Sequence, residues 1–493
     1  MNQLKPILRN YQQQLVDDVR LSLARGNSRV IMQSHVGSGK TVIATEIMRL
    51  AIAKRKKILF LAPRRQLIYQ TVETLQEYGI NTGMIMAGER RFTMPLVQVA
   101  SFDTITARVG SGRMELPEAD LVIVDEGHMC VSPARIKILS HYKLVIALTA
   151  TPALANGKGM GFFYQDIIES LSMAEMVKCG YLVPMRYFIG DAPDLTGVGL
   201  NSDGDYVEKQ LAAVTDTPSL IGDIYANWKR IASDRTTLIF AVNRKHAVHI
   251  HDEFLSHGIA SAYIDGDTPT EEREAIRQAV ESGAVQVVIN IGVMVAGVNW
   301  PRISCIIMAR QTRNIATWIQ CLGRASRLHP TKKDAIIIYH GSNFDELGMI
   351  DDPIEWSLDD KTTIRERKEK AKKEGKEPKD ITCGDCGTVF KSRRSCPNCG
   401  FEMIAKGTPI PVHEADLQEV KKVEKFTGEY KESWYQQMLG YCRRKGKKDG
   451  YAFYAYIDKF GVEPKWKKIA VEPSQEIYGW MQHKAIARSK AAA

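Results

Sequence analysis

The sequence lacks any long uninterrupted run of apolar residues. No stretch of its 493 residues approaches the roughly 18 apolar residues of a membrane-spanning helix, and its opening, MNQLKPILRN, lacks the apolar core of a signal peptide. The hydrophobic fraction of 44% and the charged fraction of 25% are typical of a globular protein in water. These absences argue against a membrane protein, so we expect a cytoplasmic chain with no membrane partner.

Cysteine is sparse over most of the chain, with nine residues in all. Four of them cluster between residues 383 and 399, and the other five are scattered, as buried or idle thiols usually are in a reducing compartment. The basic residues are also uneven. Residues 361–493 hold 29 Lys or Arg against 18 Asp or Glu, whereas residues 1–360 hold 38 against 39. A basic tail on a nearly neutral body indicates either an appended polyanion contact or a solvated charged face.

Short apolar, β-branched runs alternate with helical stretches in two series. The first occupies residues 57–62, 97–101, 121–126 and 144–151, and the second occupies residues 236–241, 260–265, 285–291, 305–310 and 335–339. Continuous apolar character marks strands buried on both faces, so we expect two tandem α/β domains with parallel sheets. The expected divisions are a first domain (1–188), a linker or loop (189–214), a second domain (215–345), a charged linker (346–380), a four-cysteine module (381–402) and a basic, aromatic, mainly helical accessory module (403–493).

The stretch SHVGSGKT, residues 34–41, resembles a phosphate-binding loop in which Ser34 replaces the usual opening glycine. Gly37 and Gly39 can supply the positive φ angles that let backbone amides curl around phosphate. Lys40 would reach the β- and γ-phosphates of ATP, and the Thr41 hydroxyl would hold Mg²⁺. Ser34 is tolerable if its position needs no positive φ. The alternative is an ordinary glycine-rich turn between a strand and a helix.

The stretch VDEGH, residues 124–128, closes a buried strand with two adjacent carboxylates. Asp125 is a candidate ligand for Mg²⁺, and Glu126 is a candidate base that orients and deprotonates the attacking water. The alternative is a solvated acidic loop.

Together these motifs resemble those of superfamily 2 helicases and translocases, the DEAD/DEAH-related group. The remaining matches follow in chain order: LRNYQQQ (8–14), APRRQLIYQ (62–70), SFDTI (101–105), TATP (149–152), IFAVNRKHA (239–247), NIGVMVAGVNWP (290–301) and QCLGRASR (320–327). Three departures stand out: Ser34 replaces the usual Gly or Ala, Gly127 gives DEGH rather than DEAD or DEAH, and Asn299 replaces the usual Asp.

The resemblance implies two RecA-like domains with ATP in the cleft between them. It implies that Gln12 contacts the adenine, that Ser38 and Gly297 belong to the nucleotide site, and that Gln320, Arg324 and Arg327 act in catalysis. Spacings of three and four predict that Gln320, Gly323, Arg324 and Arg327 share one face of a helix, with Gly323 allowing close approach of the opposite domain. Contacts to nucleic-acid phosphates, made without reading sequence, are expected from Arg64, Arg65, Ser101, Thr104, Asn243 and Arg244.

A narrower resemblance is to RadD-type proteins, which are bacterial DNA-repair ATPases. It depends on GYLVP (180–184), IDGDTPTEER (264–273) and a cysteine module after the second domain. It implies DNA rather than RNA as the partner, and the nucleoid of a bacterial or phage-infected cell as the location.

The stretch CGDCGTVFKSRRSCPNCG, residues 383–400, pairs two C-x-x-C knuckles. Cys383, Cys386, Cys396 and Cys399 are expected to bind Zn²⁺ through four thiolates in a structural zinc ribbon, with a redox role for either pair as the competitor. The basic residues between the knuckles would contact nucleic acid, or the ribbon would simply dock on the motor.

Near the end of the chain, residues 434–461 combine two helical patterns with a basic turn. The aromatics Tyr451, Phe453, Tyr454 and Tyr456 favour the core of a small helical module over a platform for stacking bases. Five cations of the turn, Arg443, Arg444, Lys445, Lys447 and Lys448, are candidate phosphate contacts, and the module is a candidate site for a protein partner.

The function expected from these patterns is a nucleic-acid-dependent ATPase, either a DNA helicase or a branch-remodelling translocase. One alternative is a recruitment or specificity subunit that uses ATP as a conformational switch without processive unwinding. A second alternative is an RNA helicase, because only contacts to the 2′-hydroxyl or to A-form shape separate RNA from DNA.

Overall fold

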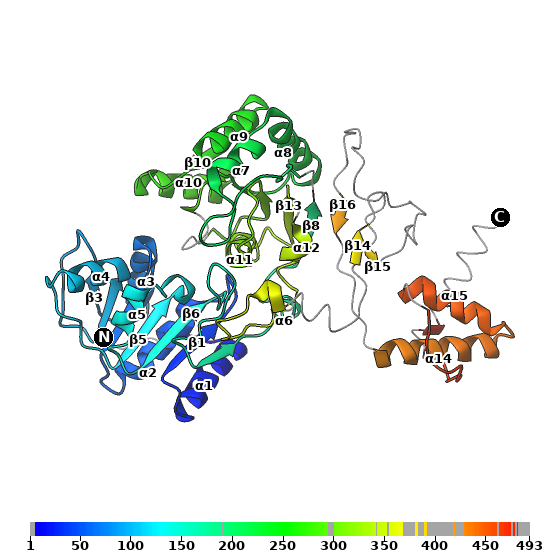
Figure 1. The fold of residues 1–493 in the computed structure, drawn as a ribbon, viewed down its shortest axis with the longest axis horizontal. Helices are drawn as coiled ribbons and strands as arrows, with labels where there is room; N and C mark the ends of the chain where they lie inside the picture. The colour runs from blue at the N-terminus through cyan, green and yellow to red at the C-terminus, as the bar shows by residue number, and fades with distance from the viewer. Residues whose placement is uncertain are drawn as a thin grey trace. The chain divides into compact units, whose positions relative to one another are not determined.

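A computed structural model describes most of the chain. The described residues are 5–189, 192–293, 300–341, 343–352, 354–367, 380–382, 389–391, 418–420, 428–460, 463–474, 477–478 and 481. The chain divides into two compact units, residues 1–376 with 413–419 and residues 377–412 with 420–493. The first unit contains two α/β lobes, each built on its own sheet (Figure 1).

Lobe 1 is built on a seven-stranded sheet in the order β3-β4-β2-β5-β6-β1-β7. Its strands are β1 (Arg29–Gln33), β2 (Ile58–Ala62), β3 (Thr82–Ile85), β4 (Val97–Ser101), β5 (Leu121–Asp125), β6 (Val145–Thr149) and β7 (Asp166–Glu169). Every pair of neighbours is parallel. The carboxyl ends of β1, β5 and β6 therefore meet at one edge, where α/β sheets carry their sites.

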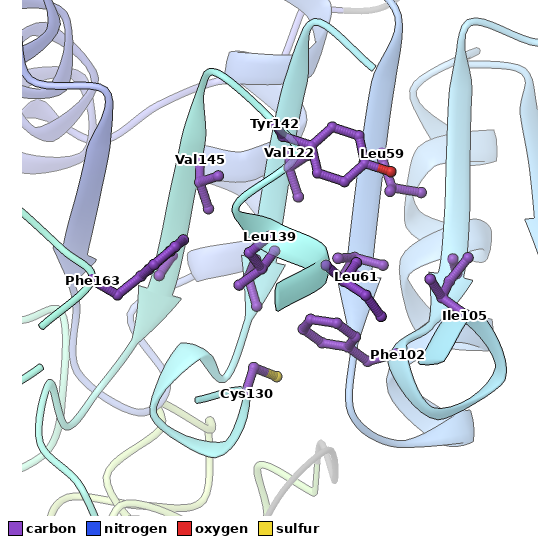
Figure 2. Packing of buried hydrophobic residues seen from close by; sticks show 14 of the residues in the cluster. Leu59, Leu61, Phe102, Ile105, Val122, Cys130, Leu139, Tyr142, Val145 and Phe163 are labelled. Atoms are coloured by element: carbon purple, nitrogen blue, oxygen red, sulfur yellow. The ribbon is translucent and has the colours of Figure 1, made fainter. Parts of the chain in front are cut away.

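Helices cover both faces of this sheet. They are α1 (Asn10–Ala24), α2 (Lys40–Ile52), α3 (Arg65–Glu77), α4 (Phe102–Gly110), α5 (Pro133–Leu139) and α6 (Met173–Lys178), with a 3₁₀ turn at Gly127–Met129. Figure 2 shows strand side chains facing side chains from α4 and α5: Leu59, Leu61, Val122 and Val145 opposite Phe102, Ile105 and Leu139. The five central strands are buried on both faces, as their continuous apolar runs predict.

Lobe 2 has a second seven-stranded sheet in the order β10-β11-β9-β12-β13-β8-β16. Its strands are β8 (Met185–Ile189), β9 (Thr237–Phe240), β10 (Ser261–Ile264), β11 (Val287–Asn290), β12 (Cys305–Met308), β13 (Ala335–Tyr339) and β16 (Gln418–Val420). Its helices are α7 (Glu208–Thr215), α8 (Pro218–Ile231), α9 (Arg244–Ser256), α10 (Thr270–Ser282), α11 (Ile315–Leu322) and α12 (Phe344–Leu347). All five predicted strands of the second series are present as β9 to β13.

The second sheet starts upstream of the boundary expected at residue 215. β8 pairs with β13 along its whole length, so the last residues assigned to the first domain belong to the second sheet. The segment expected to be a linker is also partly ordered by packing, because α7 begins at Glu208 and buries Leu211 beside Val242. Asp205 holds the loop before α7 by accepting hydrogen bonds from Thr312 Oγ1 at 2.7 Å and the Arg313 amide at 2.7 Å.

The charged linker expected at residues 346–380 is not a free tether along its whole length, because residues 357–364, which we name the return segment, pack on the protein. This segment docks on lobe 1: the Gly159 and Gly161 amides donate to the carbonyls of Asp359 and Leu358 at 2.7 and 2.8 Å, and the side chain of Ile364 is 5% exposed. The region is mostly charged, but two apolar side chains, Leu358 and Ile364, anchor it, and backbone hydrogen bonds supply the remaining contacts. The return segment therefore connects the end of lobe 2 to lobe 1.

The second unit contains an antiparallel pair, β14 (Asp380–Thr382) with β15 (Val389–Lys391), and two helices, α14 (Gly428–Arg444) and α15 (Asp449–Phe460). The two helices share an apolar core in which Tyr456 is fully buried, whereas Tyr454 is 62% exposed. The core interpretation of these aromatics therefore holds for Tyr456 and not for Tyr454. Within the described part of the chain, no helix is both long enough and apolar enough to cross a membrane.

Candidate functional site

The phosphate loop, residues 34–41, connects the end of β1 to the start of α2. Gly37 and Gly39 both have φ of +83°, as the sequence predicts. In the described residues, positive φ outside glycine occurs at Arg55 and Glu126, so Ser34 adopts an ordinary backbone conformation and tolerates its side chain. The first amides of α2 point toward the loop, and this arrangement favours an anion there.

The N-terminal segment packs directly on the phosphate loop. Gln12 is 4% exposed, and its Nε2 donates to the Ser38 carbonyl at 2.9 Å, while its Oε1 accepts from the Arg9 amide at 2.9 Å. The Tyr11 hydroxyl donates to the same Ser38 carbonyl. These bonds place the Gln12 amide beside the loop, where it keeps one N–H for a ligand.

The acidic pair lies at the end of β5, opposite the lysine of the phosphate loop. Lys40 Nζ stands 3.9 Å from Glu126 Oε1. Burial, reinforced by Glu126, raises the pKa of Asp125 to about 7. Burial also opposes ionisation of Glu126, but the positive charges of Lys40 and Arg324 outweigh it and lower the pKa of that carboxyl. Glu126 is therefore the member of the pair that stays ionised.

Backbone strain marks this turn. Glu126 has φ of +47°, a left-handed conformation that costs a non-glycine residue about 1 kcal/mol or more. The turn brings the next residue against β6, where a β-carbon on Gly127 would lie 2.6 Å from Cβ of Ala147. The glycine in DEGH therefore has a steric cause in this chain.

His128 has a role that the motif analysis did not assign. Its Nε2 lies 3.0 Å from Gln320 Nε2, and its Nδ1 lies 2.8 Å from Thr149 Oγ1. Burial lowers the pKa of His128, so the ring is neutral, accepting from Gln320 and donating to Thr149. The Thr149 carbonyl accepts from the Ser34 amide at 2.9 Å. A continuous chain of hydrogen bonds thus connects Gln320 in lobe 2 to the phosphate loop. The sequence feature that could have indicated it is the histidine two positions after Glu126.

The prediction that both arginines lie on a helix face is wrong. α11 ends at Leu322, and Arg324 and Arg327 lie in the irregular segment that follows. The backbone leaves the helix because the Ser326 carbonyl accepts from the Val183 amide at 2.8 Å and the Ala325 carbonyl accepts from Lys332. We name residues 323–327 the arginine segment.

The arginine segment lies directly against the phosphate loop of lobe 1. A β-carbon on Gly323 would stand 2.5 Å from Cβ of Val36, so glycine permits the approach that the sequence predicts. A β-carbon on Gly37 would stand 2.9 Å from Cγ of Arg327. The Ser326 hydroxyl lies 2.9 Å from the Gly323 carbonyl of its own segment and 3.2 Å from the Val36 carbonyl of lobe 1, so its one proton is shared between the two lobes.

Positive charge is concentrated where the lobes meet. Arg324 is 4% exposed and interacts electrostatically with Glu126. Burial, followed by the repulsion of Arg324, lowers the pKa of Arg327 to about 9. An anion bound between Lys40 and these two guanidiniums would offset the cost of holding them together.

A cavity of about 510 Å³ lies between the lobes beside this site. Lobe 1 contributes Arg64 and His128 to its wall, and lobe 2 contributes Asn314 and Gln320. Arg64 Nη1 donates to the Gly292 carbonyl across the lobes at 3.3 Å. Arg64, expected on a nucleic-acid phosphate, therefore lies at the lobe boundary.

Several residues expected to contact nucleic acid also hold the protein backbone. Ser101 Oγ caps α4 by accepting from the Thr104 amide at 3.3 Å, and Asn243 Oδ1 caps α9 by accepting from the His246 amide at 2.9 Å. Thr104 Oγ1 accepts from the Ala87 amide at 3.2 Å.

The two exposed arginines of this set have protein partners as well. Arg65 Nη1 donates to the Ala87 carbonyl at 2.8 Å. Arg244 Nε lies 2.9 Å from Asp265 Oδ2, and its Nη2 contacts Asp267. Any phosphate bound by Arg244 competes with these two carboxylates.

Five predicted site residues lie outside the described residues: Gly297, Cys383, Cys386, Cys396 and Cys399. Within the described part of the chain, no cluster of three or more His, Cys, Asp or Glu side chains could hold a metal ion.

Two family models match the two lobes. Residues 5–154 match the Type III restriction enzyme res subunit, and residues 218–329 match the helicase conserved C-terminal domain. The chain belongs to helicase superfamily 2. It carries both helicase domains, so the superfamily resemblance of the motifs is confirmed.

The individual relatives of this superfamily 2 chain are distant. It is 29% identical over 355 residues to the putative ATP-dependent helicase IRC3 of Saccharomyces cerevisiae, covering 68% of this chain and 51% of the yeast protein. It is 25% identical over 486 residues to a 51.5 kDa protein of a Lactococcus phage, covering 92% of this chain and 100% of the phage protein. The chain thus spans about half the length of the yeast relative.

Solved structures support the fold. A fragment of a putative HsdR subunit of a type I restriction enzyme from Vibrio vulnificus matches with a TM-score of 0.55 and 19% identity, covering 69% of this chain and 65% of that one. The prediction of two RecA-like parallel-sheet domains is confirmed.

Proposed function

We propose that this chain is an ATP-dependent nucleic-acid motor that hydrolyses ATP between its two lobes. The observation that carries the proposal is the approach of the arginine segment to the phosphate loop, where Gly323 faces Val36 and Gly37 faces Arg327. A triphosphate held by the loop would meet both arginines while the lobes are closed, and hydrolysis would weaken that closure. Cycles of closing and opening would then move the protein along a strand.

In this proposal each residue has one task. Lys40 and the loop amides of residues 37–41 hold the phosphate oxygens. Glu126 stays ionised, in keeping with its lowered pKa, and this carboxylate orients the attacking water and accepts its proton. Arg324 and Arg327 neutralise the charge that develops on the transferred phosphoryl group.

Mg²⁺ fits the oxygen donors available at this site. The Thr41 hydroxyl at the start of α2 and the Asp125 carboxylate at the end of β5 are the hard ligands that this ion prefers. When bound, the ion would neutralise phosphate charge.

The deciding experiment measures ATP hydrolysis with single-stranded DNA, duplex DNA, branched DNA and RNA. We expect strand-stimulated turnover that falls at least about 100-fold in Lys40→Ala and Glu126→Gln, because one loses the phosphate contact and the other the base. Tight ATP binding without turnover in the wild-type protein would contradict the motor and support the alternative, an ATP-switched recruitment subunit.

We further propose that the nucleic acid is DNA and that the setting is DNA repair or replication in a bacterial or phage-infected cell. The RadD-type stretches at residues 180–184 and 264–273 support this narrower assignment, and so does the full-length match to a phage protein. Stronger stimulation by RNA than by any DNA in the panel would contradict it and support the RNA helicase alternative.

We also propose a structural zinc ribbon bound by Cys383, Cys386, Cys396 and Cys399. The spacing of the two knuckles supports a closed four-thiolate site. Mass spectrometry of protein purified without chelators should find one equivalent of zinc, and Cys396→Ser should lose it. Metal-free wild-type protein would contradict the ribbon.

The accessory module is proposed to contact phosphates or a partner protein through its basic turn. Lys445 and Lys448 are exposed there, while Arg443 pairs with Asp449 and Arg444 with Glu472. Lys445→Glu with Lys448→Glu should weaken strand binding in low salt. Unchanged binding would favour the protein partner.

A further inference from the structure

Lys332 is a buried lysine to which the proposed ATP site gives no task. Its side chain is 8% exposed, and its ammonium donates three hydrogen bonds to backbone carbonyls: Ala325 at 2.8 Å, Ile303 at 2.8 Å and Pro301 at 3.1 Å. An ammonium has three N–H donors, so the three carbonyls use its whole capacity.

The three carbonyls belong to two segments that meet beside the ATP site. Ala325 is in the arginine segment, between Arg324 and Arg327. Pro301 and Ile303 precede β12. Lys332 itself follows a short turn in which its amide donates to the His329 carbonyl at 3.0 Å, so its backbone is held while its side chain reaches back to both segments.

The Ala325 carbonyl needs such a partner because α11 has already ended. No following helical turn offers an N–H to this carbonyl, and a carbonyl buried without a donor costs about 1–3 kcal/mol. Its bond to Lys332 sets the direction of the Ala325 peptide and therefore the direction in which the flanking side chains leave the backbone.

We propose that Lys332 is a positioning residue that holds the arginine segment in the conformation that places Arg324 and Arg327 against the phosphate loop. The inference depends on the proposed function, because it gives those arginines a task in hydrolysis. Lys332 acts through the Ala325 carbonyl and touches neither nucleotide nor nucleic acid.

The test compares Lys332→Met with Lys333→Met in the full chain. Lys333 is the exposed neighbour, so its substitution makes the same chemical change at the next position without removing the three buried hydrogen bonds. We expect Lys332→Met to lower kcat for strand-stimulated hydrolysis about 10-fold or more with the KM for ATP changed by less than about threefold, because a misplaced arginine loses transition-state contacts before ground-state binding. Lys333→Met should match the wild type.

A double-mutant cycle separates positioning from simple support of the fold. If Lys332 acts through the arginines, Lys332→Met should lower kcat by less than about twofold once Arg327→Ala is present. An equal loss in both backgrounds, or no loss in either, overturns the inference and leaves the motor intact.

Stability supplies the remaining control. Lys332→Gln serves as the second variant if Lys332→Met does not fold. If neither variant folds, Lys332 is required for folding, and the proposal that it positions the arginines is overturned. A wild-type protein without strand-stimulated hydrolysis, or an Arg327→Ala variant with full kcat, overturns the proposed role of the arginines and with it this inference.

Discussion

The side chain of Arg327 in lobe 2 lies against Gly37 in the phosphate loop of lobe 1, with Cγ of Arg327 2.9 Å from the position that a β-carbon on Gly37 would occupy. The same approach is closer at Gly323, where the corresponding distance to Cβ of Val36 is 2.5 Å. Two glycines on opposite lobes thus create the space in which the lobes meet.

Gly323→Ala tests this contact between the lobes. Gly323 has an ordinary φ of −60°, so alanine brings no left-handed strain, and its methyl group would collide first with Val36 of lobe 1, at 2.5 Å from Cβ, and then with the Ile319 carbonyl oxygen at 2.9 Å. We expect strand-stimulated hydrolysis to fall about 10-fold or more while lobe stability changes little. Gly222→Ala in α8 is the matched control, because a β-carbon there meets open space. Equal activity of both variants would contradict the closed arrangement.

His128 and Gln320 should be energetically coupled in hydrolysis. Each single alanine variant removes one end of the 3.0 Å hydrogen bond between the lobes, and each should lower kcat by about 10-fold. The double variant should lose little more than either single variant, since the same bond is already absent. Fully additive losses would mean that the two side chains act separately.

The return segment should depend on two glycines of lobe 1. A β-carbon on Gly161 would lie 2.4 Å from the Leu358 carbonyl oxygen, and one on Gly159 would lie 2.3 Å from that of Ser357. Gly161→Ala should therefore lower the unfolding free energy by about 1–3 kcal/mol and expose the segment to trypsin at Lys361.

The control for this experiment is Gly110→Ala, where a β-carbon has no neighbour within 4 Å. Trypsin cleavage at Lys361 that is as slow in Gly161→Ala as in the control would show that the segment does not need this close approach.

Acid should destabilise the protein partly through His246. Burial lowers the pKa of this histidine from 6.5 to about 4, although Asp216 opposes the shift while His249 and His340 add to it. The unfolded chain therefore binds more protons between about pH 6.5 and 4, and stability falls as pH drops through that window. His246→Gln should lose about 2 kcal/mol less unfolding free energy than the wild type between pH 7 and pH 5.

Urea denaturation at the two pH values measures this difference. His141→Gln, which changes an exposed histidine, serves as the control and should follow the wild type. An equal pH dependence in all three proteins would assign the acid sensitivity to other groups.

The cysteines of the first unit should differ sharply in reactivity. Burial raises the pKa of Cys130, Cys305 and Cys321 to about 12, so about one thiol in ten thousand is ionised at pH 8. Cys179 is exposed and should react with iodoacetamide first. Peptide mapping by mass spectrometry measures the order, and early labelling of Cys305 would indicate that the lobe 2 core opens.

Local signals in the sequence determined the strands and the chemistry of lobe 1. Apolar runs predicted β2, β4, β5 and β6 because each of these strands is buried on both faces. Glu126 directly follows the end of β5, and Lys40 begins the helix that follows β1. Gly37 and Gly39 have the positive φ that their motif requires, and Gly323 allows the predicted close approach of the lobes. Sequence could predict both features because each depends only on glycine having no side chain.

Only the tertiary structure determined where α11 ends, where the return segment packs and what His128 contacts. Helical spacing predicted a helix through Arg327, but hydrogen bonds from Val183 and Lys332 draw the backbone away after Leu322. The return segment was predicted as part of a charged linker because its anchors, Leu358 and Ile364, are few and its partners lie about 200 residues earlier in the chain. Likewise His128 gained its role from Gln320 in the other lobe. Contacts between residues far apart in sequence leave no periodic trace, so these features required the folded chain.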